Sequence, residues 1–252
     1  MTSLSYDIVG PDDAPVVVLL PSLGATRDMW KWQTDALSDR FRMITVDLRG
    51  HGQSPAPAEP YSIDELAEDV VSLLDELGVQ RANITGISLG GAVAQYFAQA
   101  YPDRTETLTA ISTTTRFGQR RDWLDKAELV EKEGTQALAD GVVARWFTPT
   151  WAQRNPEIVQ EFYNAIVATS DAGYAGCCHA LAQFDSSAFL ARVNAPTLVI
   201  AGQTDPSTPL EAVNRVRSGI VGSRMVTIDP AAHLVTVQQA DLVNSLLAGF
   251  WK

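Results

Sequence analysis

The sequence predicts an α/β fold, in which a mostly parallel, twisted sheet carries helices on both faces. Short apolar runs bounded by turn residues, such as Val16–Leu20 between two prolines, are typical of strands that are buried on both sides. These runs alternate with segments whose apolar residues recur at helical spacing. Such alternation is typical of right-handed crossovers between parallel strands.

The individual elements follow from the same two patterns. Within the segment 62–77, Ser62 and Glu65 form a capping box, and Gly78 supplies the stop of a helix. The expected strands cover residues 16–20, 41–46, 81–85, 107–111, 197–201 and 224–228, and the other core helices cover residues 91–98, 209–216 and 241–250.

The alternation is interrupted between residues 113 and 191. This segment contains no clear buried strand, is rich in aromatic residues, and has helical patterns at 123–143 and 158–168. We therefore expect residues 1–112 and 192–252 to form an α/β core. Residues 113–191 are expected to form a helical cap inserted over the end of the sheet.

The composition excludes some functions. The formal net charge of the 252 residues is −11, which argues against binding to nucleic acids or to anionic membranes, but leaves a small anionic substrate open. The only two cysteines, Cys177 and Cys178, are adjacent, so they are expected to be free thiols in a reducing cytoplasm, without a disulfide or a metal. The N-terminus has no signal-peptide pattern. The oligomeric state stays open, a homodimer included.

One motif points to chemistry. Residues 86–90, Gly-Ile-Ser-Leu-Gly, fit the G-x-S-x-G pattern of a nucleophile elbow, in which a serine sits on a sharp turn from a strand into a helix. The pattern alone is common, but here a predicted strand precedes it and a predicted helix follows. The glycines would let strand and helix approach closely around a strained Ser88.

A serine nucleophile needs a base, and the chain has three histidines. His233 follows the predicted strand 224–228 and therefore lies at the carboxyl edge of the sheet, where catalytic groups gather. We expect His51 to fix a loop by hydrogen bonds. His179 lies in the cap, where packing or contact with solvent is the simpler interpretation and contact with substrate stays open.

The third catalytic residue should be an acid that orients the histidine and lies between Ser88 and His233 in the sequence. Asp205 fits best, because it follows the predicted strand 197–201. Asp229, only four residues before His233, is the main rival, and Asp185 falls within the cap.

An oxyanion hole needs two backbone N–H groups. Leu89, directly after the serine, should supply one, and Leu23, in the loop after the strand 16–20, the other. Pro21 cannot donate, and Gly24 lets the chain turn away. The hydroxyl of Ser22 either contacts substrate or caps a turn.

Across its length the chain resembles the α/β-hydrolase superfamily, and more specifically the 3-oxoadipate enol-lactonases. The superfamily resemblance rests on residues 47–54 and 202–205, and the closer one on residues 22–24, 29–30, 145–148, 173–175, 178 and 180. The resemblance implies a bacterial, cofactor-free serine hydrolase that opens an enol-lactone ring in the β-ketoadipate route of aromatic catabolism. The substrate carries a carboxylate, for which the region of Arg145 and Trp146 is the candidate, although both residues could simply belong to the surface and packing of the cap.

Two other functions stay open. The same three catalytic residues could act on a simple carboxylic ester, another lactone or a carbon–carbon bond beside a ketone. A ligand sensor with a hydrolase fold is a different class, because fold does not determine function. Steady-state turnover would separate a sensor from an enzyme.

Overall fold

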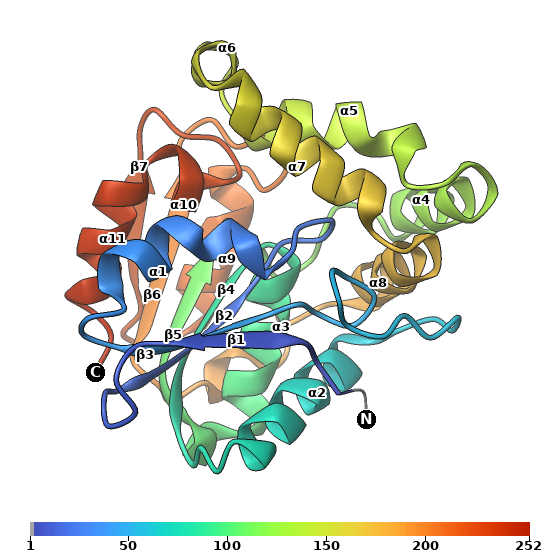
Figure 1. Cartoon of the computed structure of the whole chain (residues 1–252). Helices are drawn as coiled ribbons and strands as arrows, with labels where there is room; N and C mark the ends of the chain where they lie inside the picture. The colour runs from blue at the N-terminus through green and yellow to red at the C-terminus, as the bar shows by residue number, and fades with distance from the viewer. Residues whose placement is uncertain (1–2) are drawn as a thin grey trace.

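The computed structural model describes residues 3–252, so the first two residues of the predicted core lie outside the described part (Figure 1). Seven strands form one sheet in the order β1-β3-β2-β4-β5-β6-β7. β1 pairs antiparallel with β3, and every other pairing is parallel. The strands are β1 (Tyr6–Val9), β2 (Val16–Leu20), β3 (Arg42–Val46), β4 (Ala82–Ile87), β5 (Thr105–Ile111), β6 (Thr197–Gly202) and β7 (Arg224–Ile228).

Helices cover both faces of this sheet, which confirms the predicted α/β fold. α2 and α3 lie on one face, and α1 and α11 lie on the other (Figure 1). The core helices are α1 (Lys31–Leu37), α2 (Ile63–Glu76), α3 (Leu89–Ala100), α9 (Leu210–Gly219), α10 (Val235–Gln238) and α11 (Ala240–Ala248). Short 3-10 helices are η1 (Arg27–Trp30), η2 (Pro102–Arg104) and η3 (Leu190–Arg192).

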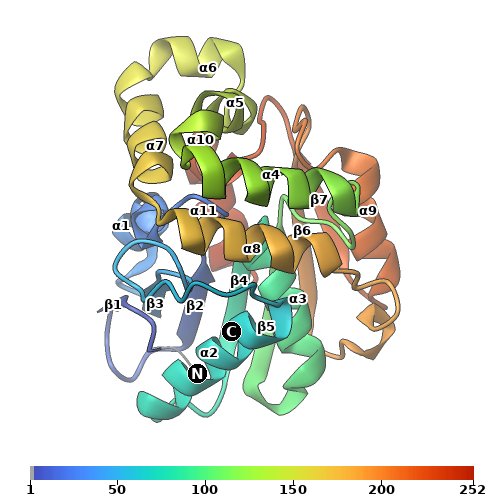
Figure 2. The ribbon, with the colours of Figure 1, turned by 90° about the vertical axis from the view of Figure 1, so that its right-hand side faces the viewer.

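Between β5 and β6 the chain forms five α-helices, followed by the 3-10 helix η3, and no strand within the described residues. The five α-helices lie together at the top and right of Figure 1, and Figure 2 shows α4 and α8 running side by side. These cap helices are α4 (Arg120–Glu133), α5 (Gln136–Trp146), α6 (Pro149–Arg154), α7 (Pro156–Ala168) and α8 (Asp171–Gln183).

Local chemistry explains several element boundaries. The capping box of α2 is present, with the N–H of Ser62 donating to Glu65 at 2.9 Å. The continuous helical pattern over residues 123–143 is in fact two helices, so the expectation of one helix was wrong. Gly134 adopts φ +80°, a conformation that ends α4, and α5 begins after Thr135.

Apart from the short 3-10 helices, five elements were not expected from the sequence: β1, α1, α6, α8 and α10. Most residues of α8 are buried, which removes the one-sided apolar pattern that identifies a helix at a surface. Among residues 3–252, no helix combines the length and the apolar character needed to cross a bilayer.

Candidate active site

Ser88 lies between the end of β4 and the start of α3, in a strained backbone conformation. Its φ is +56° and its ψ −115°, which a residue with a side chain rarely adopts. Its N–H donates to the carbonyl of Ile111 at 3.0 Å, and its carbonyl accepts from the Thr113 hydroxyl at 2.9 Å. Both hydrogen-bond partners lie in β5 or directly after it, so the neighbouring strand holds the turn at Ser88 in place.

The glycines beside Ser88 are required by close backbone contacts. A Cβ at Gly86 would lie 2.0 Å from the carbonyl oxygen of Gly90, and one at Gly90 would lie 2.3 Å from that of Leu20. No side chain fits at such distances. The expected close approach of strand and helix is therefore present, and it brings Ser88 to the carboxyl edge of the sheet.

Asp205 and His233 form a buried hydrogen-bonded pair on the loops after β6 and β7. Oδ2 of Asp205 lies 2.8 Å from Nδ1 of His233, and the two residues are 5% and 2% exposed. Since a carboxylate only accepts hydrogen bonds, Nδ1 carries the proton and Nε2 of His233 keeps its lone pair. That tautomer is the one a general base needs.

The loop after Asp205 keeps its carboxylate charged. The Thr208 hydroxyl donates to Oδ2 at 2.6 Å, and the N–H groups of Ser207 and Thr208 donate to Oδ1 at 2.7 and 3.1 Å. Burial acts to raise the pKa of Asp205, but attraction to His233 and the hydrogen bonds from His233 and Thr208 outweigh it and hold the pKa below its ordinary value. Asp205 is thus available to stabilise an imidazolium at His233.

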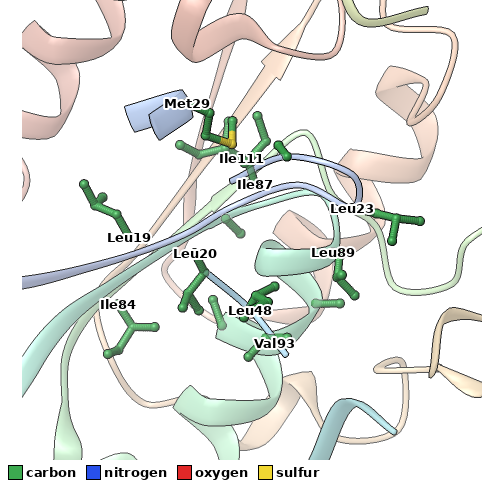
Figure 3. Close-up of a cluster of buried hydrophobic side chains, with 14 of the residues drawn as sticks. Leu19, Leu20, Leu23, Met29, Leu48, Ile84, Ile87, Leu89, Val93 and Ile111 are labelled. Carbon is green, nitrogen blue, oxygen red and sulfur yellow. The ribbon is translucent and has the colours of Figure 1, made fainter. Parts of the chain in front are cut away.

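Two backbone N–H groups near Ser88 are unused. Among the described residues, neither the N–H of Leu23 nor that of Leu89 donates a hydrogen bond. Figure 3 shows Leu23 on the loop after β2 and Leu89 on the first turn of α3. The N–H of Gly90 donates to the carbonyl of Pro21 at 3.0 Å, which joins that loop to α3. The arrangement leaves the two predicted oxyanion donors free.

A cavity of about 230 Å³ brings most of the predicted residues together. It lies between the core loops and the cap and is lined by Ser22, Leu23, Ser88, Phe117, Gly118, Asp122, Trp123, Lys126, Val142, Arg145, Trp146, Tyr174, Pro206, Ser207, Thr208 and His233. Asp205 and Leu89 do not line the cavity. Asp205 is hydrogen-bonded to His233, which does line it, and Leu89 is the residue directly after Ser88.

Three of the lining residues were predicted substrate contacts. The Ser22 hydroxyl makes no hydrogen bond with any residue from 3 to 252, so nothing there supports a turn-capping role. Trp146 is 3% exposed and packs edge-on against Phe162, with ring centroids 5.7 Å apart, while also lining the cavity. Arg145 is partly buried and lines the same cavity.

The rival histidines lie elsewhere. His51 is buried, its Nε2 accepts from the N–H of Gly24 at 2.9 Å, and its Nδ1 lies 3.2 Å from the carbonyl of Arg49. This confirms that it fixes a loop by hydrogen bonds. His179 lies outside the cavity, 4.0 Å from Glu131.

The rival acids do not contact His233. Asp229 and Asp185 are exposed, and Asp185 accepts hydrogen bonds from Ser187 in its own loop. Of the acids that were weighed as partners of His233, only Asp205 is hydrogen-bonded to it.

Sequence reasoning missed several polar residues that line the cavity, among them Lys126, Asp122 and Tyr174. Lys126 lies three residues after Trp123 within the predicted cap helix, so helical spacing could have placed both on one face. Tyr174 is 2% exposed, and its hydroxyl has no hydrogen-bond partner within the described part of the chain. Burial raises the pKa of Tyr174 far above its ordinary value, so the hydroxyl stays a neutral donor.

Comparison with known families agrees with this geometry. Residues 15–239 match the family described as alpha/beta hydrolase fold. The chain belongs to this family. Within the described residues, this α/β-hydrolase has no group of three or more His, Cys, Asp or Glu side chains arranged to hold a metal ion.

Individual relatives cover nearly the whole length of this α/β-hydrolase. It is 35% identical to 3-oxoadipate enol-lactonase 2 of Acinetobacter baylyi over 99% of this chain and 93% of that one. It is 36% identical to the enol-lactonase of Burkholderia xenovorans LB400, with a TM-score of 0.96 and coverage of 99% and 96%. A malate-bound thermophilic esterase from Thermogutta terrifontis is similar at 29% identity, with a TM-score of 0.93 and coverage of 98% and 92%.

Proposed function

We propose that this α/β-hydrolase is a serine hydrolase that opens the ring of 3-oxoadipate enol-lactone to give 3-oxoadipate. The observation that carries the proposal is the hydrogen-bonded Asp205–His233 pair, whose imidazole lines the same cavity as Ser88. The similarity to two enol-lactonases at about 35% identity over the whole chain supports the choice of substrate.

In the first half of the proposed reaction, Oγ of Ser88 attacks the lactone carbonyl while Nε2 of His233 takes its proton. The N–H groups of Leu23 and Leu89 donate to the oxyanion of the tetrahedral intermediate. The bond between the carbonyl carbon and the ring oxygen then breaks. The oxygen leaves as an enolate that takes the proton from His233, and it stays tethered to the acyl group on Ser88.

In the second half, water attacks the acyl carbon while His233 takes a proton from it. The second tetrahedral intermediate collapses, Oγ of Ser88 leaves, and His233 returns the proton to it. The product is a carboxylate, and its enol end converts to the ketone. An enolate is a better leaving group than an alkoxide, so the first step needs less help from the acid than ordinary ester cleavage does.

The substrate carries a carboxylate besides its lactone ring, and this group needs a partner in the cavity. Arg145 is our candidate on the side of the cap, with Trp146 as a wall and the Ser22 hydroxyl as a further donor. All three line the cavity beside Ser88. An arginine there would be costly without a negative partner, and the substrate would supply one.

The proposal is tested by comparing kcat/KM for the enol-lactone with kcat/KM for a neutral aryl ester such as 4-nitrophenyl butanoate. We expect the lactone to be preferred by about ten- to a hundred-fold, since a hydrogen bond to a charged group contributes about 1.5–3 kcal/mol. An equal or better rate for the neutral ester would contradict the lactonase and favour the carboxylesterase, which the similarity to the Thermogutta terrifontis esterase makes the second candidate. Tight binding without steady-state turnover would indicate a sensor.

A further inference from the structure

The cap contributes a second cation to the cavity, on a helix that is different from the one that carries Arg145. Lys126 belongs to α4, is partly buried and lines the cavity. Its Nζ lies 3.9 Å from the ring centroid of Trp123, and the indole N–H of Trp123 donates to the carbonyl of Phe117 at 2.7 Å. The ammonium is therefore held against a fixed aromatic face that also lines the cavity.

Neither cation has a carboxylate partner. Within residues 3–252, no salt bridge joins Lys126 or Arg145 to an acid. By contrast, the buried Arg49 is paired with Asp69 at 2.8 Å. Two positive groups thus share a cavity whose lining holds one acid, the exposed Asp122, and neither forms a salt bridge with it, in a chain whose net charge is −11.

The charged and titratable groups that act on Lys126 come from three cap helices. Burial and the positive charge of Arg145, on α5, lower the pKa of Lys126. The opposing influences are Cys178 of α8 and Asp122 of α4, which is exposed. Burial raises the pKa of Cys178 to about 12, so this thiol brings no negative charge near neutral pH. The ammonium and the guanidinium would both be stabilised by an anion from outside.

We propose that Lys126 is a specificity-determining residue, which together with Arg145 binds the carboxylate that the substrate carries away from the bond to be cleaved. This inference rests on the proposed function, because it assumes that Ser88 attacks a substrate in this cavity. It goes further in that it assigns recognition of the anion to a pair of cations from two different helices of the cap.

The test uses two aryl esters that differ only in charge. 4-Nitrophenyl hemiglutarate carries a terminal carboxylate, and 4-nitrophenyl pentanoate carries a methyl group in its place. The measured quantity is the ratio of kcat/KM for the anionic ester to that for the neutral ester. In Lys126→Met we expect this ratio to fall by about ten- to a hundred-fold, mostly through KM, because one charged hydrogen bond is lost.

Lys132→Met is the matched control. It removes the same charge from the same helix, but the side chain of Lys132 is 78% exposed and does not line the cavity. We expect the control to leave the ratio unchanged. If Lys126→Met also leaves it unchanged while the folded enzyme hydrolyses both esters, or if the control lowers it equally, the inference is wrong.

Lys126→Arg provides a second readout. It keeps the positive charge, so we expect the ratio to be restored to within a few-fold of the wild-type value. In the wild type, the KM for the anionic ester should rise with pH as Lys126, with its lowered pKa, loses its proton, and this rise should be absent in Lys126→Arg. An alkaline rise that persists in Lys126→Arg would overturn the assignment. Absence of turnover of every ester and lactone by the wild type would instead contradict the proposed function.

Discussion

At the scale of single residues, one of the two histidines that take no part in the proposed chemistry, His51, supports the loop of a proposed oxyanion donor. His51 is 1% exposed and uses both ring nitrogens in hydrogen bonds to the backbone. Its Nε2 accepts from Gly24, the residue after Leu23, so the ring holds the loop that carries a proposed oxyanion donor. A proton on Nε2 would face the N–H of Gly24 and break this contact.

The stability of the protein should therefore depend on pH through His51. Burial lowers the pKa of His51 to about 4, whereas an unfolded histidine titrates near pH 6.5. A lowered folded pKa contributes stability that is fully present above pH 6.5 and is lost as pH falls toward 4, by up to about 3 kcal/mol. We expect the free energy of unfolding to fall more steeply over this range in the wild type than in His51→Gln.

The comparison of slopes removes the contribution of the carboxylates, which titrate in both proteins. His51→Gln will be less stable than the wild type at neutral pH, so the test compares how the free energy of unfolding changes with pH and not its absolute value. Chemical denaturation at several pH values measures it. Parallel curves for the two proteins would show that His51 is not a neutral, hydrogen-bonded group in the folded state.

At the scale of elements, one glutamine joins the cap to the loop of the proposed base. Oε1 of Gln238 accepts from the N–H groups of Ala232 and Thr148 at 3.1 and 3.3 Å, and its Nε2 donates to the Thr148 hydroxyl at 2.6 Å. The N–H of Leu234 also donates to the carbonyl of Trp146 at 2.9 Å. The end of α5 and the start of α6 are thus bonded to residues on either side of His233.

We expect Gln238→Met, which keeps the volume but loses these hydrogen bonds, to lower kcat by about ten-fold on lactone and neutral ester alike. The reason is that the loop of His233 loses its support while the anion-binding residues stay. Gln239→Met is the control, because among the described residues this partly buried side chain hydrogen-bonds only to the carbonyl of Pro230, at 2.7 Å. A Gln238→Met enzyme that is less stable but has the kcat of the wild type would reduce Gln238 to a structural role.

The elements also show where sequence reasoning succeeds. Strands β2 to β7 were predicted because their short runs of apolar and β-branched residues alternate with helical segments. β1 was missed because it is a four-residue edge strand with alternating burial. α4 and α5 were merged because their apolar patterns continue across the break, and only the backbone of Gly134 separates them. α8 gave no one-sided pattern because it is buried between α4 of the cap and the core.

At the scale of the whole molecule, the core part of the candidate site follows from the sequence, whereas its cap part was only partly expected, with Arg145 and Trp146 named and Lys126 missed. Ser88, Asp205 and His233 follow parallel strands, and parallel strands end at one edge of a sheet, so their order along the chain predicts that they meet. Lys126 and Arg145 lie on two helices whose packing depends on the cap as a unit. No local pattern in the sequence indicates which face of α4 lines the cavity.

The whole proposed mechanism depends on Ser88 as the nucleophile. The most direct measurement is kcat/KM for 3-oxoadipate enol-lactone in Ser88→Ala, with Asp205→Asn and His233→Ala beside it, after circular dichroism has shown that each variant is folded. We predict a loss of about 10⁴-fold or more for Ser88→Ala and His233→Ala, and of about 10³–10⁴-fold for Asp205→Asn, whose amide no longer favours the required tautomer of His233. Near-wild-type turnover of the lactone and of aryl esters by Ser88→Ala would contradict the assignment of Ser88 as the nucleophile.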